Sequence, residues 1–199
     1  MALALLGVSV VLHTFPSVPD LDTSGGEGNR NLREDQPHAW PQWLGPTRDG
    51  VSPETGLLAA WPQDGPPRLW EIDLGPGYSS CAIARGRLVT MTYVHGREVI
   101  VCLNADTGKT IWRRAYEASY QGMDGRFNQG PRSTPALDGD RVYTVGATGV
   151  FACWRLVDGA PLWRHDLRAE FEAPTLQWGV SFSPLIVKDL VYTNPGGKK

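Results

Sequence analysis

The residue groups that could perform chemistry in this sequence are few and incomplete. Gly108-Lys109-Thr110 has the closing letters of a phosphate-binding loop, but Leu103 stands where that motif needs a glycine. Gly179-Val180-Ser181 begins like the sharp turn that presents a nucleophilic serine, but Ser183 replaces its second glycine. We therefore interpret the first group as a turn between two strands and the second as the start of a strand.

The histidines and cysteines do not have the spacing of metal ligands. No CxxC pair or Cys/His cluster occurs, so the sequence predicts neither a zinc site nor a disulfide framework. Cys102 and Cys153 recur at one position of a repeat, which favours small buried side chains over ligands or a reactive pair. We assign no catalytic and no metal-binding residue among His13, His38, His95, His165, Cys81, Cys102 and Cys153.

The composition excludes several classes of protein. The chain has 19 Lys and Arg against 21 Asp and Glu, so it lacks the basic excess of a nucleic-acid binder. With 41% hydrophobic residues it is too apolar for a disordered chain. Its 23 glycines and 16 prolines predict many turns, and its 8 tryptophans predict large aromatic side chains packed between short strands.

Internal repeats give these strands an order. An apolar residue, a tryptophan and then alternating polar and apolar positions recur around Trp70, Trp112 and Trp163, at spacings of 42 and 51 residues. A second series reads as a strand, a tight polar turn and another strand, which is the pattern of a hairpin. Its copies are Cys81–Val89, Pro135–Tyr143 and Pro184–Tyr192.

One repeat therefore contains four short antiparallel strands, which predicts the blade of an all-β propeller. A single blade cannot cover both of its faces, so neighbouring blades must stack. A tryptophan at the same place in each blade would fill the gap between them. We expect Trp70, Trp112 and Trp163 to lie between blades, together with the turn glycines Gly108 and Gly159.

The chain divides into a leader, a linker and a partial propeller. Residues 1–18 begin with an apolar, uncharged stretch that is about half as long as a membrane span, which favours a secretory signal over a chance apolar leader. Residues 19–39 have the composition of a disordered linker. Residues 40–199 hold about two full blades and parts of two others, over 40–74, 75–118, 128–168 and 178–199.

The segment Leu103-Asn-Ala-Asp-Thr-Gly-Lys-Thr-Ile-Trp112 resembles the repeat of quinoprotein-like propellers, which is named after pyrroloquinoline quinone (PQQ). The runs Trp40–Gly50, Gly130–Pro135 and Asn194–Gly197 resemble members from planctomycete-type bacteria. The resemblance implies a closed ring of seven or eight blades in the family. We therefore expect this chain to be a fragment of a longer protein or a truncated product, and an open stack of blades to aggregate or oligomerise.

The resemblance also brings an enzymatic alternative, the N-terminal half of a PQQ-dependent alcohol dehydrogenase. That chemistry would need PQQ, a Ca²⁺ ion held by carboxylate and amide oxygens, and an Asp acting as base. Many such enzymes carry two adjacent cysteines, which are absent here, and the aspartates Asp106, Asp138, Asp140 and Asp158 all fall in predicted turns. We expect no cofactor, and PQQ with Ca²⁺ only under this alternative.

Residues that precede the first strand of each blade would surround one mouth of the central channel. A small polar or anionic ligand could bind there to hydroxyls, an arginine and aromatic rings. In the simpler interpretation, the hydroxyls only satisfy strand ends and Trp178 packs under a loop. The loop Tyr120–Gly130 adds Arg126 and Asn128, and the mouth candidates are Tyr78, Ser79, Arg132, Ser133, Thr134, Trp178 and Ser181.

The predicted function is a binding or protein-interaction scaffold in the periplasm or outside the cell. The expected partner is a protein or a small polar ligand, with no nucleic acid, no membrane span, and further blades of a parent chain needed to close the ring. The family includes propellers that act purely as protein-interaction scaffolds. A third hypothesis is a truncated product without independent activity.

Overall fold

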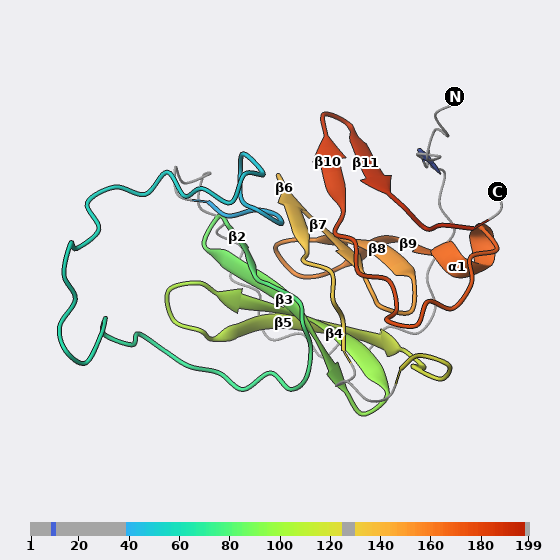
Figure 1. The fold of residues 1–199 in the computed structure, drawn as a ribbon, viewed down its shortest axis with the longest axis horizontal. Helices are drawn as coiled ribbons and strands as arrows, with labels where there is room; N and C mark the ends of the chain where they lie inside the picture. The colour runs from blue at the N-terminus through green and yellow to red at the C-terminus, as the bar shows by residue number, and fades with distance from the viewer. Residues whose placement is uncertain (1–8, 11–38, 125–129, 198–199) are drawn as a thin grey trace, which may run out of the picture.

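A computed structural model of the chain describes residues 9–10, 39–124 and 130–197. It contains two four-stranded antiparallel sheets followed by a hairpin whose sheet has a third, two-residue strand (Figure 1). The predicted leader and linker lie almost entirely outside the described residues, as do Arg126 and Asn128 of the predicted contact loop.

The strands of each sheet follow one another in chain order. The first sheet consists of β2 (Ala82–Ala84), β3 (Arg87–Val94), β4 (Arg97–Asn104) and β5 (Thr110–Glu117). The second consists of β6 (Ala136–Asp138), β7 (Arg141–Val145), β8 (Val150–Arg155) and β9 (Pro161–Asp166). The third has the order β1-β11-β10, from β1 (Ser9–Val10), β10 (Leu185–Val187) and β11 (Leu190–Thr193).

Tight turns set the strand register of the first sheet. Arg85 and Gly86 join β2 to β3, and His95 and Gly96 join β3 to β4, all four with positive φ. Two-residue loops of this conformation match the right-handed twist of the flanking strands. One short helix occurs in the described part of the chain, α1 (Leu167–Glu170). It begins after Asp166, whose side chain accepts hydrogen bonds from the Arg168 and Ala169 amides.

The turn that joins the last two strands is the same in both full sheets, although its side chains differ. The Gly108 amide donates to the Asn104 carbonyl (2.9 Å) in the first sheet, and the Gly159 amide donates to the Arg155 carbonyl (2.8 Å) in the second. Asn104 Oδ1 accepts from the Thr107 amide (2.9 Å), whereas an Arg155–Asp158 ion pair closes the second turn. Gly108-Lys109-Thr110 is therefore a turn followed by a strand.

Each of these turn glycines lies against a tryptophan of the preceding repeat. A Cβ added to Gly108 would lie 2.6 Å from the Trp70 ring, and one added to Gly159 would lie 2.6 Å from the Trp112 ring. The indole of Trp70 donates to the Ala105 carbonyl (3.1 Å), and that of Trp112 donates to the Leu156 carbonyl (2.9 Å). The two contacts repeat at the same offset, three residues before the glycine.

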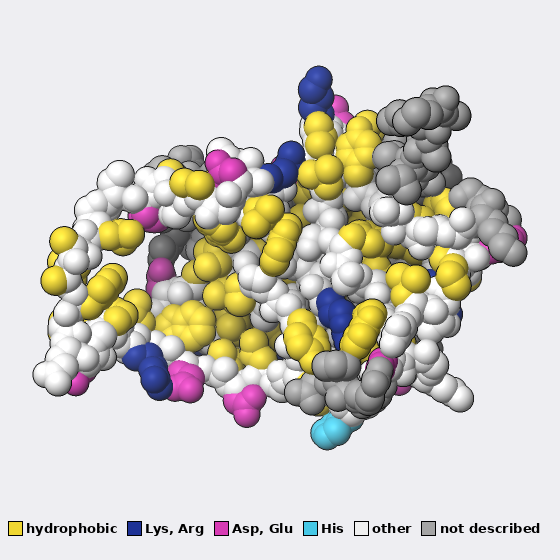
Figure 2. Space-filling view, viewed as in Figure 1, with side chains coloured by type: hydrophobic (Ala, Val, Ile, Leu, Met, Phe, Trp, Pro, Cys, Tyr) yellow, Lys and Arg dark blue, Asp and Glu magenta, His cyan; other side chains and the backbone are white. Residues whose placement is uncertain are grey.

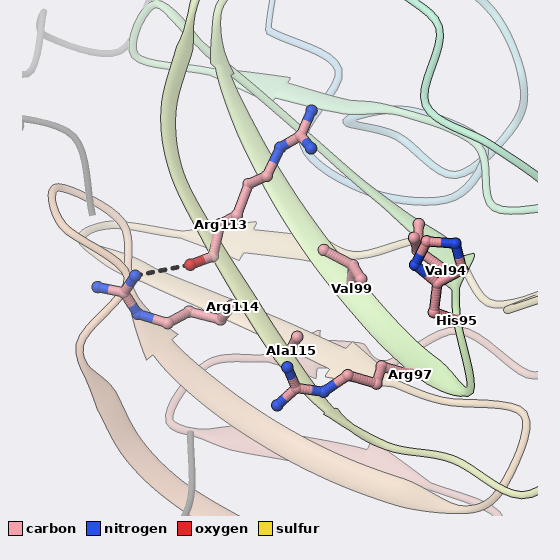
Figure 3. Close-up of a pocket in the computed structure, with 7 residues that line it drawn as sticks. All are labelled: Val94, His95, Arg97, Val99, Arg113, Arg114 and Ala115. Atoms are coloured by element: carbon pink, nitrogen blue, oxygen red, sulfur yellow. Dashed lines mark hydrogen bonds between the residues drawn. The ribbon is translucent and has the colours of Figure 1, made fainter. Parts of the chain in front are cut away.

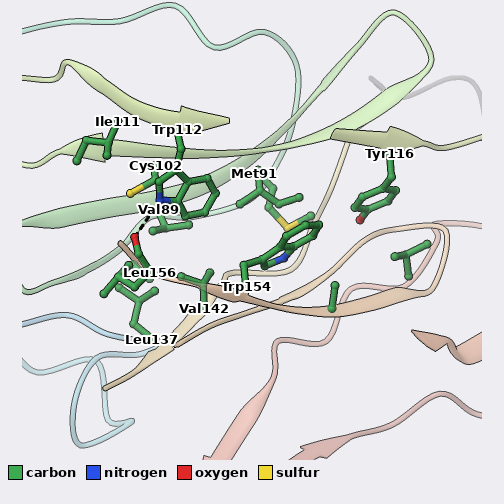
Figure 4. Packing of buried hydrophobic residues seen from close by; sticks show 14 of the residues in the cluster. Val89, Met91, Cys102, Ile111, Trp112, Tyr116, Leu137, Val142, Trp154 and Leu156 are labelled. Carbon is green, nitrogen blue, oxygen red and sulfur yellow. Dashed lines mark hydrogen bonds between the residues drawn. The ribbon is translucent and has the colours of Figure 1, made fainter. Parts of the chain in front are cut away.

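The core consists of layers between successive sheets. The layer between the first and second sheets contains Trp112, Trp154 and Val142, all buried (Figure 4). The next layer joins the second sheet to the β10–β11 hairpin, where Trp163 packs edge-to-face on Phe151 with ring centroids 4.7 Å apart. This stacking of antiparallel four-stranded sheets, with almost no helix, confirms the predicted all-β incomplete propeller.

Among the innermost strands, β6 lies beside both β2 and β10, as successive innermost strands do in a propeller. A bridging segment that precedes the loop 51–81, residues 40–48, bonds to all three. Trp40 exchanges two backbone hydrogen bonds of 2.8 Å with Ile83 of β2, and the Pro41 carbonyl accepts from the Leu137 amide of β6 (2.8 Å). The Arg48 guanidinium donates to the Ile186 carbonyl of β10.

Residues 51–81 contain no regular strand and form a wide loop, drawn in teal in Figure 1. At its end Trp70, Ile72 and Leu74 pack on the outer side of the first sheet, while Glu71 and Asp73 face solvent. The predicted blade ranges 75–118 and 128–168 thus each contain one four-stranded sheet, whereas 40–74 contributes the bridging segment, the loop and this extended stretch. Within the described residues, no helix has the length and apolar character that crossing a membrane requires.

Candidate functional site

Three chain segments lead into the innermost strands β2, β6 and β10, at the end that a propeller would present as one mouth of its channel. Residues 76–80 precede β2, residues 130–134 precede β6, and residues 177–181 precede β10. We call these the mouth segments. They contain every residue that the sequence singled out for ligand binding at the mouth.

The first two mouth segments are in direct contact. The Tyr78 amide donates to the Pro131 carbonyl (2.8 Å), and the Arg132 guanidinium lies 5.0 Å from the centre of the Tyr78 ring. Arg132 also donates to the Gly130 carbonyl (2.9 Å). Glycine is required for this approach, because a Cβ on Gly130 would lie 2.6 Å from the Gly77 Cα. A cation is thus held over an aromatic ring that remains 51% exposed.

The third mouth segment presents Trp178, which is 43% exposed. The backbone on both sides of it is fixed. The Asp124 amide donates to the Gln177 carbonyl (2.8 Å), and the Gln177 side chain donates to the Asp124 carboxylate (3.1 Å). On the other side, the Val180 amide donates to the Ala147 carbonyl (2.8 Å).

The hydroxyl residues of the mouth differ in exposure. Ser181 is exposed and Ser79 is half-buried, with its hydroxyl donating to the Ser80 carbonyl (3.1 Å). Ser133 and Thr134 are buried, at 0% and 2% exposure, so a ligand at the mouth does not reach them in this structure. The accessible part of the site therefore consists of the exposed Tyr78, Trp178 and Ser181 and the half-buried Arg132.

The side chains of the mouth segments are suited to binding a partner rather than to catalysing a reaction. Two large aromatic surfaces and one cation can bind a partner through apolar burial, stacking and charge-assisted hydrogen bonds. Among the described residues, no three His, Cys, Asp or Glu side chains are grouped as metal ligands would be.

The cysteines behave as core residues. Cys102 and Cys153 are fully buried, and burial raises the pKa of each thiol to about 12. Each faces the tryptophan of its own sheet, in the register pairs Cys102–Trp112 and Cys153–Trp163. Burial likewise raises the pKa of Cys81, which is half-buried. These thiols are poor nucleophiles near neutral pH.

The repeat pattern, the sheets and the tryptophan contacts match a known sequence family. The family described as outer membrane protein assembly factor BamB matches residues 96–198, which is half of the chain. The chain belongs to this family of PQQ-like repeat proteins. No curated protein matches it.

Solved structures with PQQ-like repeats resemble parts of the chain. BamB from Moraxella catarrhalis is 20% identical, with a TM-score of 0.41 over 63% of this chain and 34% of that one. Quinohemoprotein alcohol dehydrogenase from Comamonas testosteroni is 18% identical, with a TM-score of 0.41 over 61% of this chain and 17% of that one. The enzyme ADHIIG from Pseudomonas putida HK5 gives 21% identity and the same TM-score and coverage. This PQQ-like repeat chain thus spans about a third of the BamB structure and less of the dehydrogenases.

A hollow lies on the outer face of the first sheet and is lined by residues outside the mouth segments. Its volume is about 210 Å³. The Arg113 and Arg114 side chains at its border point in different directions, and Arg114 is held by the Arg113 and Asp158 carbonyls (Figure 3). Arg97 pairs with Glu117 (3.1 Å). Because its basic side chains do not converge, we do not treat this hollow as a ligand site.

Two structural features were missed by the sequence-based reasoning. The first is the bridging segment at Trp40, which was assigned to a blade. The second is the buried carboxylate of Glu98 in β4. In the sequence Glu98 is a charged residue immediately before the apolar run Val99-Ile100-Val101. Strand alternation alone cannot distinguish a surface position from a buried one at this place.

Proposed function

We propose that this PQQ-like repeat chain acts as a binding or protein-interaction scaffold outside the cytoplasm, and that it engages its partner at the channel mouth. The observation that carries the proposal is the Tyr78–Arg132 pair on two neighbouring mouth segments, together with the exposed Trp178 on the third. Tyrosine, tryptophan and arginine are the residue types that most often dominate the energy of protein interfaces.

The fixed geometry of the mouth supports this proposal. Arg132 is held by its hydrogen bond to Gly130 and by the Tyr78 ring, and the backbone beside Trp178 is bonded on both sides. Groups that are ordered before binding lose less conformational entropy when a partner arrives. Such a surface suits a protein, or a small polar or anionic ligand, better than it suits nucleic acid, since the chain carries a formal charge of −2.

A photo-crosslinking comparison tests the proposal. A benzoylphenylalanine in place of the exposed Ser181 reports on contacts at the mouth. One in place of the exposed Lys109, in the turn between β4 and β5, serves as the control. We expect a specific adduct at position 181 only, reduced at least about fivefold by Arg132→Ala without a change in thermal stability. Equal adducts at both positions, or a yield that Arg132→Ala leaves unchanged, would contradict it.

A quinoprotein dehydrogenase domain is the second candidate, and the repeat Leu103–Trp112 favours it. The groups that would serve PQQ and Ca²⁺ do not fit here: adjacent cysteines are absent from the sequence, and no acidic cluster lines the described part of the channel. Of the turn aspartates, Asp158 is paired with Arg155. We therefore derive no catalytic step through these groups.

A further inference from the structure

Glu98 is completely buried, yet its carboxylate has a full set of hydrogen-bond donors. Oε1 accepts from the Tyr120 hydroxyl (2.6 Å) and from the Ala147 amide (2.8 Å). Oε2 accepts from the Tyr116 hydroxyl (2.6 Å), and the Thr148 amide also bonds to the carboxylate. A buried carboxylate is costly unless it is hydrogen-bonded, and this one is bonded on all sides.

The second sheet provides the space for this carboxylate. Gly146 follows β7, and a Cβ at that position would overlap both Glu98 Oε2 and the Tyr116 hydroxyl. The carboxylate therefore belongs to a site built from both sheets. Glu98 and Tyr116 come from the first sheet, and Gly146, Ala147 and Thr148 come from the turn between β7 and β8.

Two partners of Glu98 lead directly to the third mouth segment. Tyr120 begins the stretch that ends at Asp124, whose amide bonds to Gln177 (2.8 Å). Ala147 donates to Glu98 and at the same time accepts from the Val180 amide (2.8 Å). Both sides of Trp178 are thus connected to a single carboxylate, each through two hydrogen bonds and the short piece of chain between them.

A third connection reaches the first mouth segment. The Tyr120 ring packs edge-to-face on Tyr93, with centroids 4.7 Å apart. The Tyr93 amide donates to the Pro76 carbonyl (2.9 Å), and the neighbouring Thr92 hydroxyl bonds to the same carbonyl (2.9 Å). Pro76 lies two residues before Tyr78.

We propose that Glu98 is a positioning residue for the channel mouth: its carboxylate holds residues 120–124 and the Ala147 turn, and through them it sets the place of Trp178. The importance of this positioning for binding rests on the proposed function, whereas the positioning itself can be measured without a ligand. An apolar side chain would fill the same space and would leave the Tyr116, Tyr120 and Ala147 donors without their acceptor.

Amide hydrogen exchange of the free chain tests this role. In Glu98→Met, we expect the Asp124 and Val180 amides to exchange at least about tenfold faster than in the native chain, while the Cys153 amide within β8 changes much less. Glu98→Gln keeps an acceptor for Tyr120 and Ala147 and should restore most of the protection. Glu117→Met is the matched control, because Glu117 is an exposed carboxylate on the neighbouring β5.

Tyr120→Phe provides a second test that does not depend on how well Glu98→Met folds. It removes one hydroxyl and keeps the ring against Tyr93, so exchange should rise at Asp124 and stay unchanged at Val180. A uniform rise over both sheets, or no change at Asp124 and Val180, would overturn the positioning role. Loss of the Ser181 crosslink in Arg132→Ala tests the proposed function separately, since no partner is needed for the exchange measurement.

Discussion

At position 98 the chain keeps a buried carboxylate immediately before the apolar residues 99–103 of β4, and both burial and hydrogen bonds act on the pKa of this group. Burial is the largest cause and raises the pKa of Glu98 above its usual value. Hydrogen bonds from Tyr116, Tyr120 and the Ala147 and Thr148 amides oppose the rise. The Arg164 guanidinium lies 5.2 Å from the centre of the Tyr116 ring.

This direction predicts how stability depends on pH. A group whose pKa is higher in the folded chain stabilises it fully below the unfolded pKa, near 4.5, and this contribution is lost as pH rises through the folded pKa. The difference in unfolding free energy between the native chain and Glu98→Gln should therefore become less favourable to the native chain as pH rises above 4.5. Each unit of pKa corresponds to about 1.4 kcal/mol. Urea unfolding of both chains between pH 4 and 8 measures this, and a difference that grows with pH would mean that the anion is the favoured form.

At the scale of the elements, the tryptophan and the turn glycine of the next sheet form one repeated contact. Trp112 is buried and its indole is hydrogen-bonded to Leu156 across the two sheets. Trp112→Ala should destabilise the chain by about 3 to 5 kcal/mol, the range for truncation of a large aromatic side chain in a core. A loss below about 1 kcal/mol in urea unfolding would show that this contact does not hold the sheets together.

Two turn glycines with similar φ allow the cost of backbone conformation to be measured apart from the cost of packing. Gly139 and Gly159 both have a left-handed φ, of 56° and 69°, but only Gly159 lies against a ring. Gly139→Ala should cost about 1 to 2 kcal/mol for the backbone alone. Gly159→Ala should cost about 1 to 3 kcal/mol more, because its Cβ must displace Trp112. Equal midpoints for the two variants in thermal unfolding would contradict the stacking of Gly159 on Trp112.

The sequence predicted those elements whose signals are local. The hairpins around Gly86 and Gly139 follow from turn residues between alternating strands, and the repeat predicted a sheet even where only Gly159 and Trp163 match the pattern. The bridging segment could not be predicted, since Trp40 bonds to Ile83, a residue far along the chain. Among the mouth residues, the burial of Ser133 and Thr134 follows from tertiary packing that no local pattern reports.

At the scale of the whole molecule, apolar side chains remain exposed at both ends of the stack. Figure 2 shows hydrophobic side chains along the loop before the first sheet, where Leu57, Leu58, Trp61 and Leu69 are each more than half exposed. At the other end, the β10–β11 hairpin borders an apolar hollow of about 380 Å³ that Leu185 and Val187 line. Exposed apolar areas of this kind are characteristic of surfaces that other protein parts cover.

The isolated chain should therefore self-associate as its concentration rises. Sedimentation velocity measures this, and replacing Leu185 and Val187 together with serine should weaken the association at least several-fold, because it removes apolar area from the hollow. Leu162→Ser is the matched control, since Leu162 is also a strand residue with 38% exposure but lies on β9. A chain that stays monomeric at all concentrations would show that the exposed apolar ends of the stack do not drive association.

The proposed role requires that this PQQ-like repeat chain acts by binding at its mouth rather than by quinone chemistry. The direct measurement is a titration of PQQ with Ca²⁺, on this chain and on any longer polypeptide that contains it, followed by tryptophan fluorescence and by alcohol-dependent reduction of a dye. We predict neither saturable quenching nor turnover, with the mouth still able to form the Ser181 crosslink. Saturable quenching together with turnover would contradict the binding role and identify the chain as part of a quinoprotein dehydrogenase.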